Sequence, residues 1–381
     1  MPIGTPHGTL DYKQVSKVTF VGASSNTVID TTTGSLGIGV DGNGPTSNLH
    51  VVGNAFVSSN LTVSGFIGTS ETGALTVPSG TTAQQPTGVA GMIRFNSTVN
   101  RLEVYNGTQW HSLGGVNAIG GTVTSVDGYT IHTFTGASGT FTVLSGGEVE
   151  YLVVAGGGGG GAGVAGGGGA GGMLTGNMTL AADQYTITIG GGGVGGIPGN
   201  TWRGTNGSDS SIASLVVAIG GGAGSSAQHT GPGLSALSGG SGGGGSWYTD
   251  STGITGAGGG TIGQGNNGGN GVTNYQSGAG GGGSGSAGSN AVAISTAGNG
   301  GDGLESSISG TNTRYAGGGG GGANGTPGTG GLGGGGDGGN NTNNGVNGTV
   351  NTGGGGGGGW NYSNGNGGSG GSGIVIIRYL S

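Results

Sequence analysis

Alternating apolar and polar residues recur in short segments through the first part of the chain. Leu49 and Val51 flank the polar His50, and the same pattern returns 12 residues later at Leu61 and Val63, within a repeated S-N-L-x-V-x-G motif. Period-two alternation bounded by glycine turns is typical of β-strands. A strand this narrow cannot bury its apolar side within one chain, so we expect three identical chains to intertwine and cover it for one another.

Further strands are predicted up to residue 155. The apolar spacing of 92–96 and 101–110 predicts two strands joined by a short turn, and an Asn-Gly pair supplies a second turn signal. Three more segments predict a β-meander that leads into the remaining sequence: 129–136, 139–147 and 148–155. We find no helical periodicity of useful length. The first part is therefore expected to be all-β.

Glycine content separates the second part from the first. Of 113 glycines, 25 lie in residues 1–155 and 88 in residues 156–381, in runs of up to seven. Each interior glycine costs a helix about 1 kcal/mol and packs nothing in a strand. A solvated coil and an extended left-handed helix with three residues per turn remain open. Collagen is excluded, because glycine does not recur at every third position and the chain has only 8 prolines.

Order is favoured over a flexible linker because apolar segments punctuate the glycine-rich part. The chain closes on the strand-like 373–381, and we expect 151–155 and 374–379 to pair or lie close, which ties both ends of one compact unit. These apolar, β-branched segments are 151–155, 185–190, 214–220 and 291–295. Between them, polyglycine II helices would bond laterally through their backbones, and this lattice would replace a side-chain core.

The predicted fold class is therefore all-β: trimeric β-fibre modules at the N-terminal side, followed by a glycine-rich domain of packed polyglycine II helices framed by β-strands. The predicted parts are an N-terminal attachment segment (1–46), intertwined β-fibre modules (47–115), the β-meander (116–155) and the polyglycine II domain with its closing strand (156–381).

Charge and cysteine content exclude several partners. The net charge is −7, charged residues make up 6% of the chain and no lysine follows Lys17. We therefore expect no nucleic-acid partner. No apolar stretch reaches the roughly 18 residues of a membrane span, so no membrane insertion is expected. The chain has no cysteine, and its first residues lack the pattern of a secretory signal. A durable extracellular object assembled inside a host cell fits these features.

Catalytic and metal-binding motifs are weak, and we predict no enzyme, no cofactor and no metal site. The acids of the glycine-rich part are far apart in sequence, and nothing selects a glycosidase pair among them. Residues 297–305 nearly match one calcium-binding nonapeptide, but that fold needs tandem copies, so we expect Asp302 to be a solvated loop residue. The histidines show no ligand spacing.

Aromatic residues of the glycine-rich part lie between the runs, often beside an arginine. One interpretation is that they cap the ends of the lattice or pack between subunits. The other is that they form a receptor-binding surface, because rigid aromatics and arginine on loops of a stiff scaffold are typical of binding hot spots. The candidate receptor-binding residues are Trp202, Arg203, Trp247, Tyr248, Tyr275, Arg314, Tyr315, Trp360 and Tyr362.

Three stretches resemble viral fibre proteins. Residues 36–65 resemble repeats in fibres of large algal viruses and tailed phages, and 91–114 are similar to a tail-fibre β module that ends in N-G-x-x-W-x-x-L-G. Residues 128–163, with the closing 371–379, resemble the glycine-rich domain of marine viral fibres. Similar domains in distal phage adhesins and in a receptor tyrosine kinase ectodomain form polyglycine II lattices, so the resemblance implies that fold.

The resemblance implies a virion-surface fibre or spike subunit that attaches to the host. Its expected partners are two further copies of itself in a homotrimer, other virion proteins through the N-terminus, and a host-surface glycan or protein. Modest affinity at each site suffices when several copies engage together. The alternative is a purely structural virion or extracellular filament component without receptor binding. An enzyme such as a capsule depolymerase is a more distant alternative.

Overall fold

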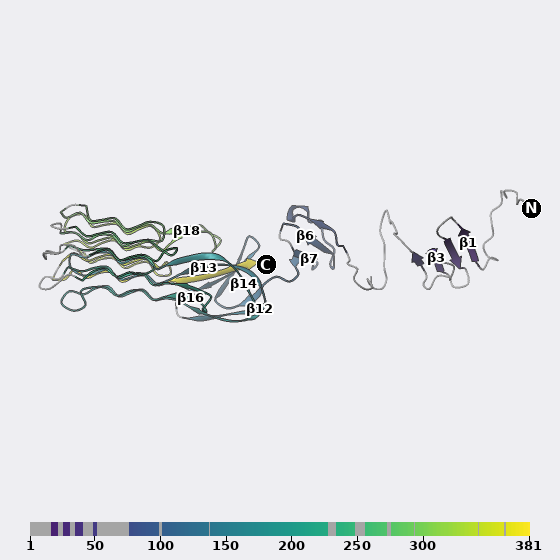
Figure 1. Cartoon of the computed structure of the whole chain (residues 1–381), viewed down its shortest axis with the longest axis horizontal. Helices are drawn as coiled ribbons and strands as arrows, with labels where there is room; N and C mark the ends of the chain where they lie inside the picture. The colour runs from purple at the N-terminus through teal and green to yellow at the C-terminus, as the bar shows by residue number, and fades with distance from the viewer. Residues whose placement is uncertain are drawn as a thin grey trace, which may run out of the picture. The chain divides into compact units, whose positions relative to one another are not determined.

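The computed structural model describes residues 76–98, 101–136, 138–227, 234–247, 256–272, 276–292, 294–341, 343–361 and 363–381, together with the backbone of four strands nearer the N-terminus. The chain divides into two compact units, Met1–Thr76 and Val77–Ser381 (Figure 1). The described part is all-β apart from a short 3-10 helix, η2 (Thr82–Gln84).

The first unit contains a four-stranded sheet in the order β1-β2-β3-β4. The three pairs β1–β2, β2–β3 and β3–β4 are antiparallel, antiparallel and parallel. The strands are β1 (Lys17–Val21), β2 (Asn26–Asp30), β3 (Ser35–Val40) and β4 (Leu49–Val51). The first copy of the S-N-L-x-V-x-G motif thus forms a strand, and the second copy, with Leu61 and Val63, lies outside the described residues.

The second unit begins with a small sheet in the order β5-β6-β7-β8. Strand β6 pairs antiparallel with β7, so that Arg94 lies opposite Glu103 and Phe95 opposite Leu102. This confirms the hairpin predicted from the apolar spacing of the two segments. The strands are β5 (Ser79–Gly80), β6 (Ile93–Asn96), β7 (Arg101–Tyr105) and β8 (Trp110–Ser112).

Two five-stranded sheets follow, and they pack face to face. The first has the order β10-β11-β20-β13-β14 and the second β17-β16-β15-β12-β9. The first is built from β10 (Thr122–Val126), β11 (Tyr129–Phe134), β13 (Gly147–Val154), β14 (Met173–Leu180) and β20 (Ile374–Leu380). The second is built from β9 (Asn117–Ile119), β12 (Gly139–Ser145), β15 (Asp183–Thr188), β16 (Ser210–Ile212) and β17 (Val216–Ala218).

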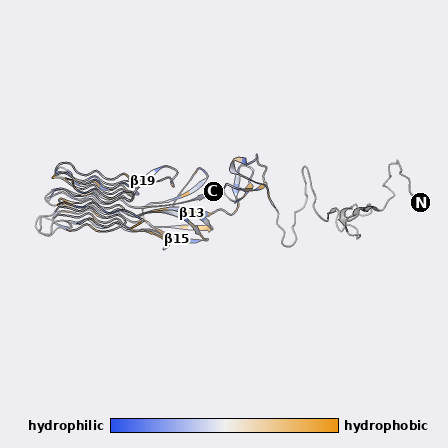
Figure 2. Cartoon of the chain, turned by 45° about the horizontal axis from the view of Figure 1, so that its top comes forward, coloured by the Kyte–Doolittle hydropathy of each residue, from blue (hydrophilic) through white to orange (hydrophobic). Residues whose placement is uncertain are grey.

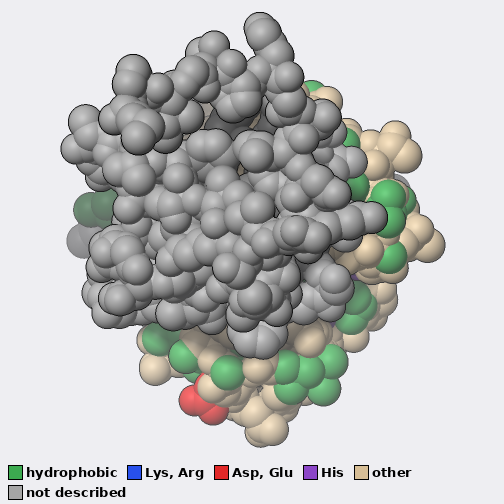
Figure 3. Space-filling model, turned by 90° about the vertical axis from the view of Figure 1, so that its right-hand side faces the viewer, with side chains coloured by type: hydrophobic (Ala, Val, Ile, Leu, Met, Phe, Trp, Pro, Cys, Tyr) green, Lys and Arg blue, Asp and Glu red, His purple; other side chains and the backbone are tan. Residues whose placement is uncertain are grey.

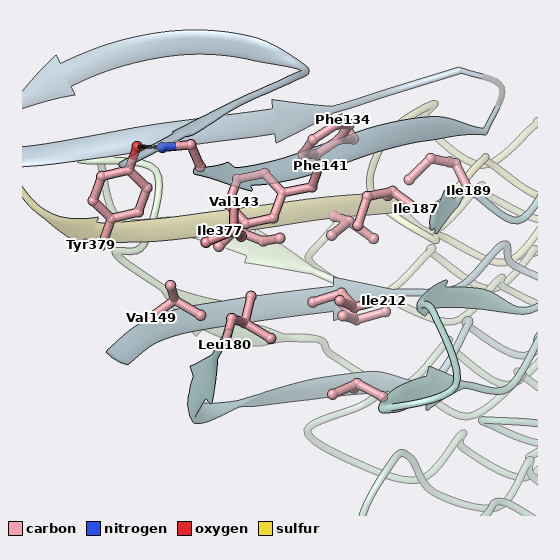
Figure 4. Close-up of a cluster of buried hydrophobic side chains, with 14 of the residues drawn as sticks. Phe134, Phe141, Val143, Val149, Leu180, Ile187, Ile189, Ile212, Ile377 and Tyr379 are labelled. Atoms are coloured by element: carbon pink, nitrogen blue, oxygen red, sulfur yellow. Dashed lines mark hydrogen bonds between the residues drawn. The ribbon is translucent and has the colours of Figure 1, made fainter. Parts of the chain in front are cut away.

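A hydrophobic core lies between these two sheets. Phe141, Ile187 and Ile212 of the second sheet meet Val375 and Ile377 of the first, and all five are fully buried. Figure 4 shows Phe141, Ile187, Ile212 and Ile377 among the side chains that extend from both sheets into the shared layer. At about 25 cal/mol per Å² of apolar surface buried, such a layer is the main conventional hydrophobic contribution to stability.

The expected pairing of the two ends of the glycine-rich part is confirmed. Strand β20 pairs antiparallel with β13, with Leu152 opposite Ile376 and Val153 opposite Val375. The predicted β-meander is wrong, although its three segments are strands. Strand β20 inserts between β11 and β13, while β12 joins the other sheet because Phe141 and Val143 face the inter-sheet core. Because β20 comes from the far end of the sequence, the residues around β11 and β13 do not indicate that another strand pairs between them.

The apolar segment 291–295 forms no strand among its described residues. The described residues of this segment form a turn, in which the N–H of Val292 donates to the carbonyl of Thr296 over 3.2 Å. The side chains of Val292 and Ile294 are exposed. An apolar run this short, with no neighbouring strand to pair with, does not form a sheet.

The described glycine runs form neither helices nor strands, and they bond to one another through the backbone. Along run 156–163, successive N–H groups donate to three different neighbours in rotation, so each neighbour receives every third N–H group. The carbonyl groups accept in the same rotation from three other neighbours. The six neighbouring runs are 166–169, 193–196, 202–208, 221–224, 356–359 and 365–371. We call the arrangement of runs between residues 155 and 373 the glycine lattice.

The interior of this lattice admits few side chains, and those it holds are small, such as the buried Ala223 and Ser241. A Cβ atom on Gly158 would lie 2.2 Å from the carbonyl oxygen of Gly222, and one on Gly168 would lie 2.1 Å from that of Gly158, whereas real Cβ atoms essentially never approach within 3.0 Å. In Figure 2 the runs are mostly pale, since glycine lies near the middle of the hydropathy scale. The lattice interior is therefore a core made of backbone.

Outer runs of the lattice carry a polar motif that completes the hydrogen bonding of their neighbours. The motif is N-G-x-[N/D], and its two side chains, three residues apart, accept from two N–H groups that are also three residues apart. Asn344 accepts from the N–H of Asn366 and Asn347 from that of Ser369. The other copies are Asn206 with Asp209, Asn267 with Asn270, and Asn299 with Asp302.

The side chains of the N-G-x-[N/D] motif, which we call caps, accept from N–H groups at the lattice surface. Without them, a further run would be needed to supply the acceptors. Asp302 is exposed and lies outside the strands, as expected for a solvated loop residue, and it also has this hydrogen-bonding role. Its Oδ1 accepts from the N–H of Leu332 over 2.8 Å. The match to a calcium-binding repeat therefore reflects the N-G-x-[N/D] motif at this position.

A buried histidine links the first sheet to the core. The Nδ1–H of His132 donates to the carbonyl of Gly120 over 2.8 Å, so Nε2 accepts from the hydroxyl of Tyr379 over 3.0 Å. That hydroxyl in turn accepts from the N–H of Ala118. The chain of donors fits the neutral imidazole, and burial lowers the pKa of His132 below its ordinary value of 6.5.

Inserting a side chain into the lattice should be far more harmful than adding one at its surface. A Cβ on Gly319 would lie 2.1 Å from the carbonyl oxygen of Gly356. We expect Gly319→Val to lower the free energy of unfolding by several kcal/mol, since each stranded buried N–H or C=O group costs about 1–3 kcal/mol. Gly191→Val, where no atom lies within 4 Å of the added Cβ, is the matched control. Thermal unfolding measures both.

The exposed Asn343→Val, in a turn between runs, should also be nearly neutral. Equal and small effects of Gly319→Val and Gly191→Val would contradict a close-packed lattice and support a flexible tract.

Stability should fall as the pH drops from 7 to 5. Because the pKa of His132 is lower in the folded chain, the unfolded chain takes up the proton first, and the stabilisation present above pH 6.5 is lost below it. His132→Gln removes this titration, so its melting temperature should change less over that window than that of the wild type. His111→Gln, on an exposed position, should keep the wild-type slope. An identical pH dependence in His132→Gln would refute the assignment.

Candidate functional site

The glycine lattice has one end at the sheets and one end made of turns, which we call the tip. Run 156–163 starts directly after β13 and reaches the tip at its last residues, where the N–H of Ala162 donates to the carbonyl of Trp202. Trp360 follows Gly359, whose carbonyl accepts from Ala165 in the next turn. Trp202 and Trp360 therefore both lie at the tip.

Trp247 and Arg203 lie at the same end. Trp247 ends run 241–246, whose residue Gly245 donates to the carbonyl of Gly269 near the tip. Arg203 Nη1 donates to the carbonyl of Ser235 in a neighbouring turn over 3.3 Å. Four of the candidate receptor-binding residues are therefore brought together at one end of the domain.

Each tip tryptophan is half-buried, so one part of the indole is anchored and another faces solvent. The indole N–H of Trp360 donates to the carbonyl of Gln276 over 3.3 Å, which fixes the ring against the neighbouring turn. The indole nitrogen of Trp247 is buried, and it has no hydrogen-bond partner among the described residues. A buried donor without an acceptor is uncommon and costs about 1–3 kcal/mol.

Arg314 and Tyr315 lie away from the tip. They belong to the hairpin of β18 (Leu304–Ser306) and β19 (Thr313–Tyr315), at the sheet end of the lattice. Tyr315 is only 5% exposed and packs in a second hydrophobic cluster with Ile308 and Leu152. Its side chain is therefore part of the core and is not available to a partner.

Arg314 forms an exposed ion pair with Glu305, with 2.8 Å between Nη2 and Oε1. A hydrogen bond from Asn312 and the charge of Arg314 lower the pKa of Glu305. Both side chains are largely exposed, so the pair contributes little to stability. The ion pair joins the two strands of the hairpin, and it is not part of the tip.

The three remaining candidates, Tyr248, Tyr275 and Tyr362, lie outside the described residues. Each directly follows or precedes a described residue of the tip in sequence: Trp247, Gln276 or Asn361.

Sequence reasoning missed a polar hollow at the tip. It has a volume of about 40 Å³ and lies between the turns 340–344 and 361–365. Its lining is Asn340, Asn341, Asn343, Asn344, Asn361, Asn364 and Gly365. Asparagine amides both donate and accept, so this surface can bind uncharged polar groups. The sequence did contain a signal for this hollow, the N-N-T-N-N cluster at 340–344. The cluster was not recognised as a site because asparagine is also frequent in turns.

Charged chemistry is sparse in the described part of the chain. No group of three or more histidine, aspartate or glutamate side chains is placed there to bind a metal ion. Among the described side chains visible in Figure 3, hydrophobic and uncharged ones predominate. In the same described ranges, no helix has the length and apolar character needed to cross a bilayer.

A comparison with protein families identifies the fold unit that carries this tip. The family model described as a glycine-rich domain matches residues 132–380, which is more than half of the chain. The chain belongs to the glycine-rich domain family. The matched region runs from β11 to β20, so the glycine-rich domain includes strands of both five-stranded sheets and the lattice between them. No curated protein shows significant similarity to the chain.

Proposed function

We propose that this protein is a virion fibre or spike subunit that attaches to the host surface through the tip of its glycine-rich domain. The observation that carries the proposal is the gathering of Trp202, Arg203, Trp247 and Trp360 at one end of a backbone-bonded scaffold. Tryptophan and arginine are the residues that most often dominate binding interfaces. The resemblance of 36–65 and 91–114 to viral fibre modules supports placing this scaffold on a virion.

We infer that the glycine runs are polyglycine II helices. Three features support this: donation to the same neighbour at every third residue, six neighbours around run 156–163, and contact distances that leave no room for a Cβ. A left-handed helix with three residues per turn directs its N–H groups outward in three directions, which matches the rotation of partners along each run. Such a lattice holds the tip turns stiffly, so little conformational entropy is lost when they bind.

The fibre part of the proposal rests on the small sheet of β5 to β8. One face of this sheet buries Arg94 and Glu103, which are 5% and 4% exposed and form an ion pair. The opposite face presents Ile93, 49% exposed, and Leu102, 41% exposed, on paired strands. A sheet that buries its charged face and exposes its apolar one lacks a covering layer.

Further copies of the same chain supply that layer in the proposed homotrimer. Identical chains running side by side present the same apolar face at the same height, so residues 36–115 of three copies would bury Ile93 and Leu102 against one another. Trimerisation also places three tips on one fibre, and linked sites raise avidity well above the affinity of one site.

The alternative function is a structural virion or filament component without receptor binding. The bonds from Trp360 to Gln276 and from Arg203 to Ser235 favour it, because both tie neighbouring turns together as caps would. On this alternative the tip residues stabilise the lattice and bind nothing outside it.

The full-length protein should be a homotrimer in solution. Ile93→Asp with Leu102→Asp places charges on the open apolar face and should convert the trimer to smaller species with a folded glycine-rich domain. Thr108→Asp, in the exposed turn before β8, is the control and should leave the trimer intact. Analytical ultracentrifugation measures the mass. A stable, folded wild-type monomer would rule out the trimeric fibre.

Removal of two tip tryptophans should abolish attachment. Fluorescently labelled protein is tested by flow cytometry against a panel of microalgal and bacterial cultures, with unlabelled protein as competitor. Trp247→Ser with Trp360→Ser should lose binding to any culture that the wild type stains, since truncation of hot-spot residues costs about 2 kcal/mol or more each. Leu332→Ser with Val350→Ser, which changes exposed apolar residues at the sheet end, is the matched control.

The melting temperature and trimer mass are measured for every variant. Normal binding by the double tryptophan variant, or loss of binding only together with unfolding, would place the receptor site elsewhere. Absence of wild-type staining on every culture would favour the structural alternative.

A further inference from the structure

A groove lies on the first five-stranded sheet, at the end of the sheet that is far from the tip. Two cavities, of about 180 and 370 Å³, share three lining residues: Glu150, Asn177 and Arg378. These three form one cross-strand row, because Arg378 of β20 lies opposite Glu150 of β13, which lies opposite Asn177 of β14. The two cavities are therefore parts of one groove with a continuous floor. Their combined size is within the roughly 300–1,000 Å³ typical of small-molecule sites.

The floor of the groove is held rigidly. Arg378 donates from Nε and Nη2 to Glu150, over 3.0 and 2.7 Å, and from Nη1 to the carbonyl of Ser307, over 3.1 Å. The guanidinium also stacks on Tyr129, 4.4 Å from the ring centroid. These contacts fix the sheet, the β18–β19 hairpin and an aromatic ring in one arrangement before any ligand arrives, which lowers the entropic cost of binding.

Polar groups with spare capacity converge on this floor. Asn177 uses one amide hydrogen on Glu148, over 3.2 Å, which leaves its carbonyl and the second carboxylate oxygen of Glu148 free to accept. Thr175 lines the larger cavity. Arg101 lines the smaller one, and its buried Nη1 has no hydrogen-bond partner among the described residues. This nitrogen is enclosed by protein, so a ligand in the cavity would contact the remaining part of the Arg101 side chain.

The charge of the groove selects the class of ligand. The smaller cavity is lined by two arginines, Arg101 and Arg378, and two glutamates, Glu148 and Glu150. An ion of either sign would meet repulsion as well as attraction there. A sugar hydroxyl both donates and accepts, so it can satisfy guanidinium and carboxylate groups at once.

We propose that this groove binds a neutral oligosaccharide, with one sugar unit in the smaller cavity beside Tyr129 and further units along the larger one. Hydroxyl groups of the first unit accept from the Arg101 side chain and donate to Glu148, and the next unit contacts Asn177 and Thr175. The site is separate from the tip, so it goes beyond the proposed attachment function and does not depend on it.

A glycan array of neutral and sialylated oligosaccharides, probed with the labelled full-length protein, tests the proposal, and isothermal titration calorimetry quantifies each hit. We expect binding to at least one neutral glycan. Asn177→Ala and Glu148→Gln should each weaken that binding at least tenfold. Thr179→Ala is the matched control, since Thr179 lies on the same strand and the same face as Asn177, is also exposed, and does not line the groove.

The tip variant Trp247→Ser with Trp360→Ser should keep the neutral-glycan binding, which separates this site from the attachment site. Melting temperatures confirm that each variant is folded. Absence of neutral-glycan binding, binding of sialylated glycans alone, or unchanged affinity in Asn177→Ala and Glu148→Gln would each overturn the proposal.

Discussion

Lateral bonding between bare backbones is the constraint on which the rest of the structure depends. A run whose N–H groups point in three directions must have neighbours within hydrogen-bond distance on every side, and at that distance a Cβ on Gly158 would overlap the carbonyl of Gly222. Glycine is therefore required by the contact, even though it loses more conformational entropy on folding than any other residue. That entropy cost is why the lattice needs a conventional core and capped edges to persist.

The two five-stranded sheets provide that core, and they also set the register of the lattice. Strand β13 leads directly into run 156–163, and β20 directly follows the last run, so the pairing of Leu152 with Ile376 aligns the first and last runs. At the outer runs the N-G-x-[N/D] motif replaces missing neighbours, as Asn347 does for the N–H of Ser369. Hydrophobic burial thus closes one end, and side-chain amides close the sides.

The sequence predicted the parts of this fold better than their arrangement. Strands at 151–155 and 374–379 and their pairing followed from apolar runs that flank the glycine-rich part. The separation of β12 from β11 and β13 did not, because it results from the insertion of a strand more than 200 residues away. The N-G-x-[N/D] caps escaped notice because asparagine before glycine also signals a turn. The same ambiguity hid the asparagine-lined hollow.

Candidate site residues show the same limit. Composition places aromatic residues at the ends of runs, but it does not say which end. Trp247 and Tyr315 both flank glycine runs, yet one lies at the tip and the other is buried at the sheet end. Whether a residue lies at the tip or at the sheet end depends on the direction in which its run crosses the lattice. That direction is known only when the turns between successive runs are counted from the sheets. Because a side chain at most interior glycines would clash with neighbouring carbonyl groups, we expect substitutions to be tolerated mainly in the turns and on the sheet surface. Any binding specificity of this domain would therefore come from those two places, where polar or aromatic side chains are clustered.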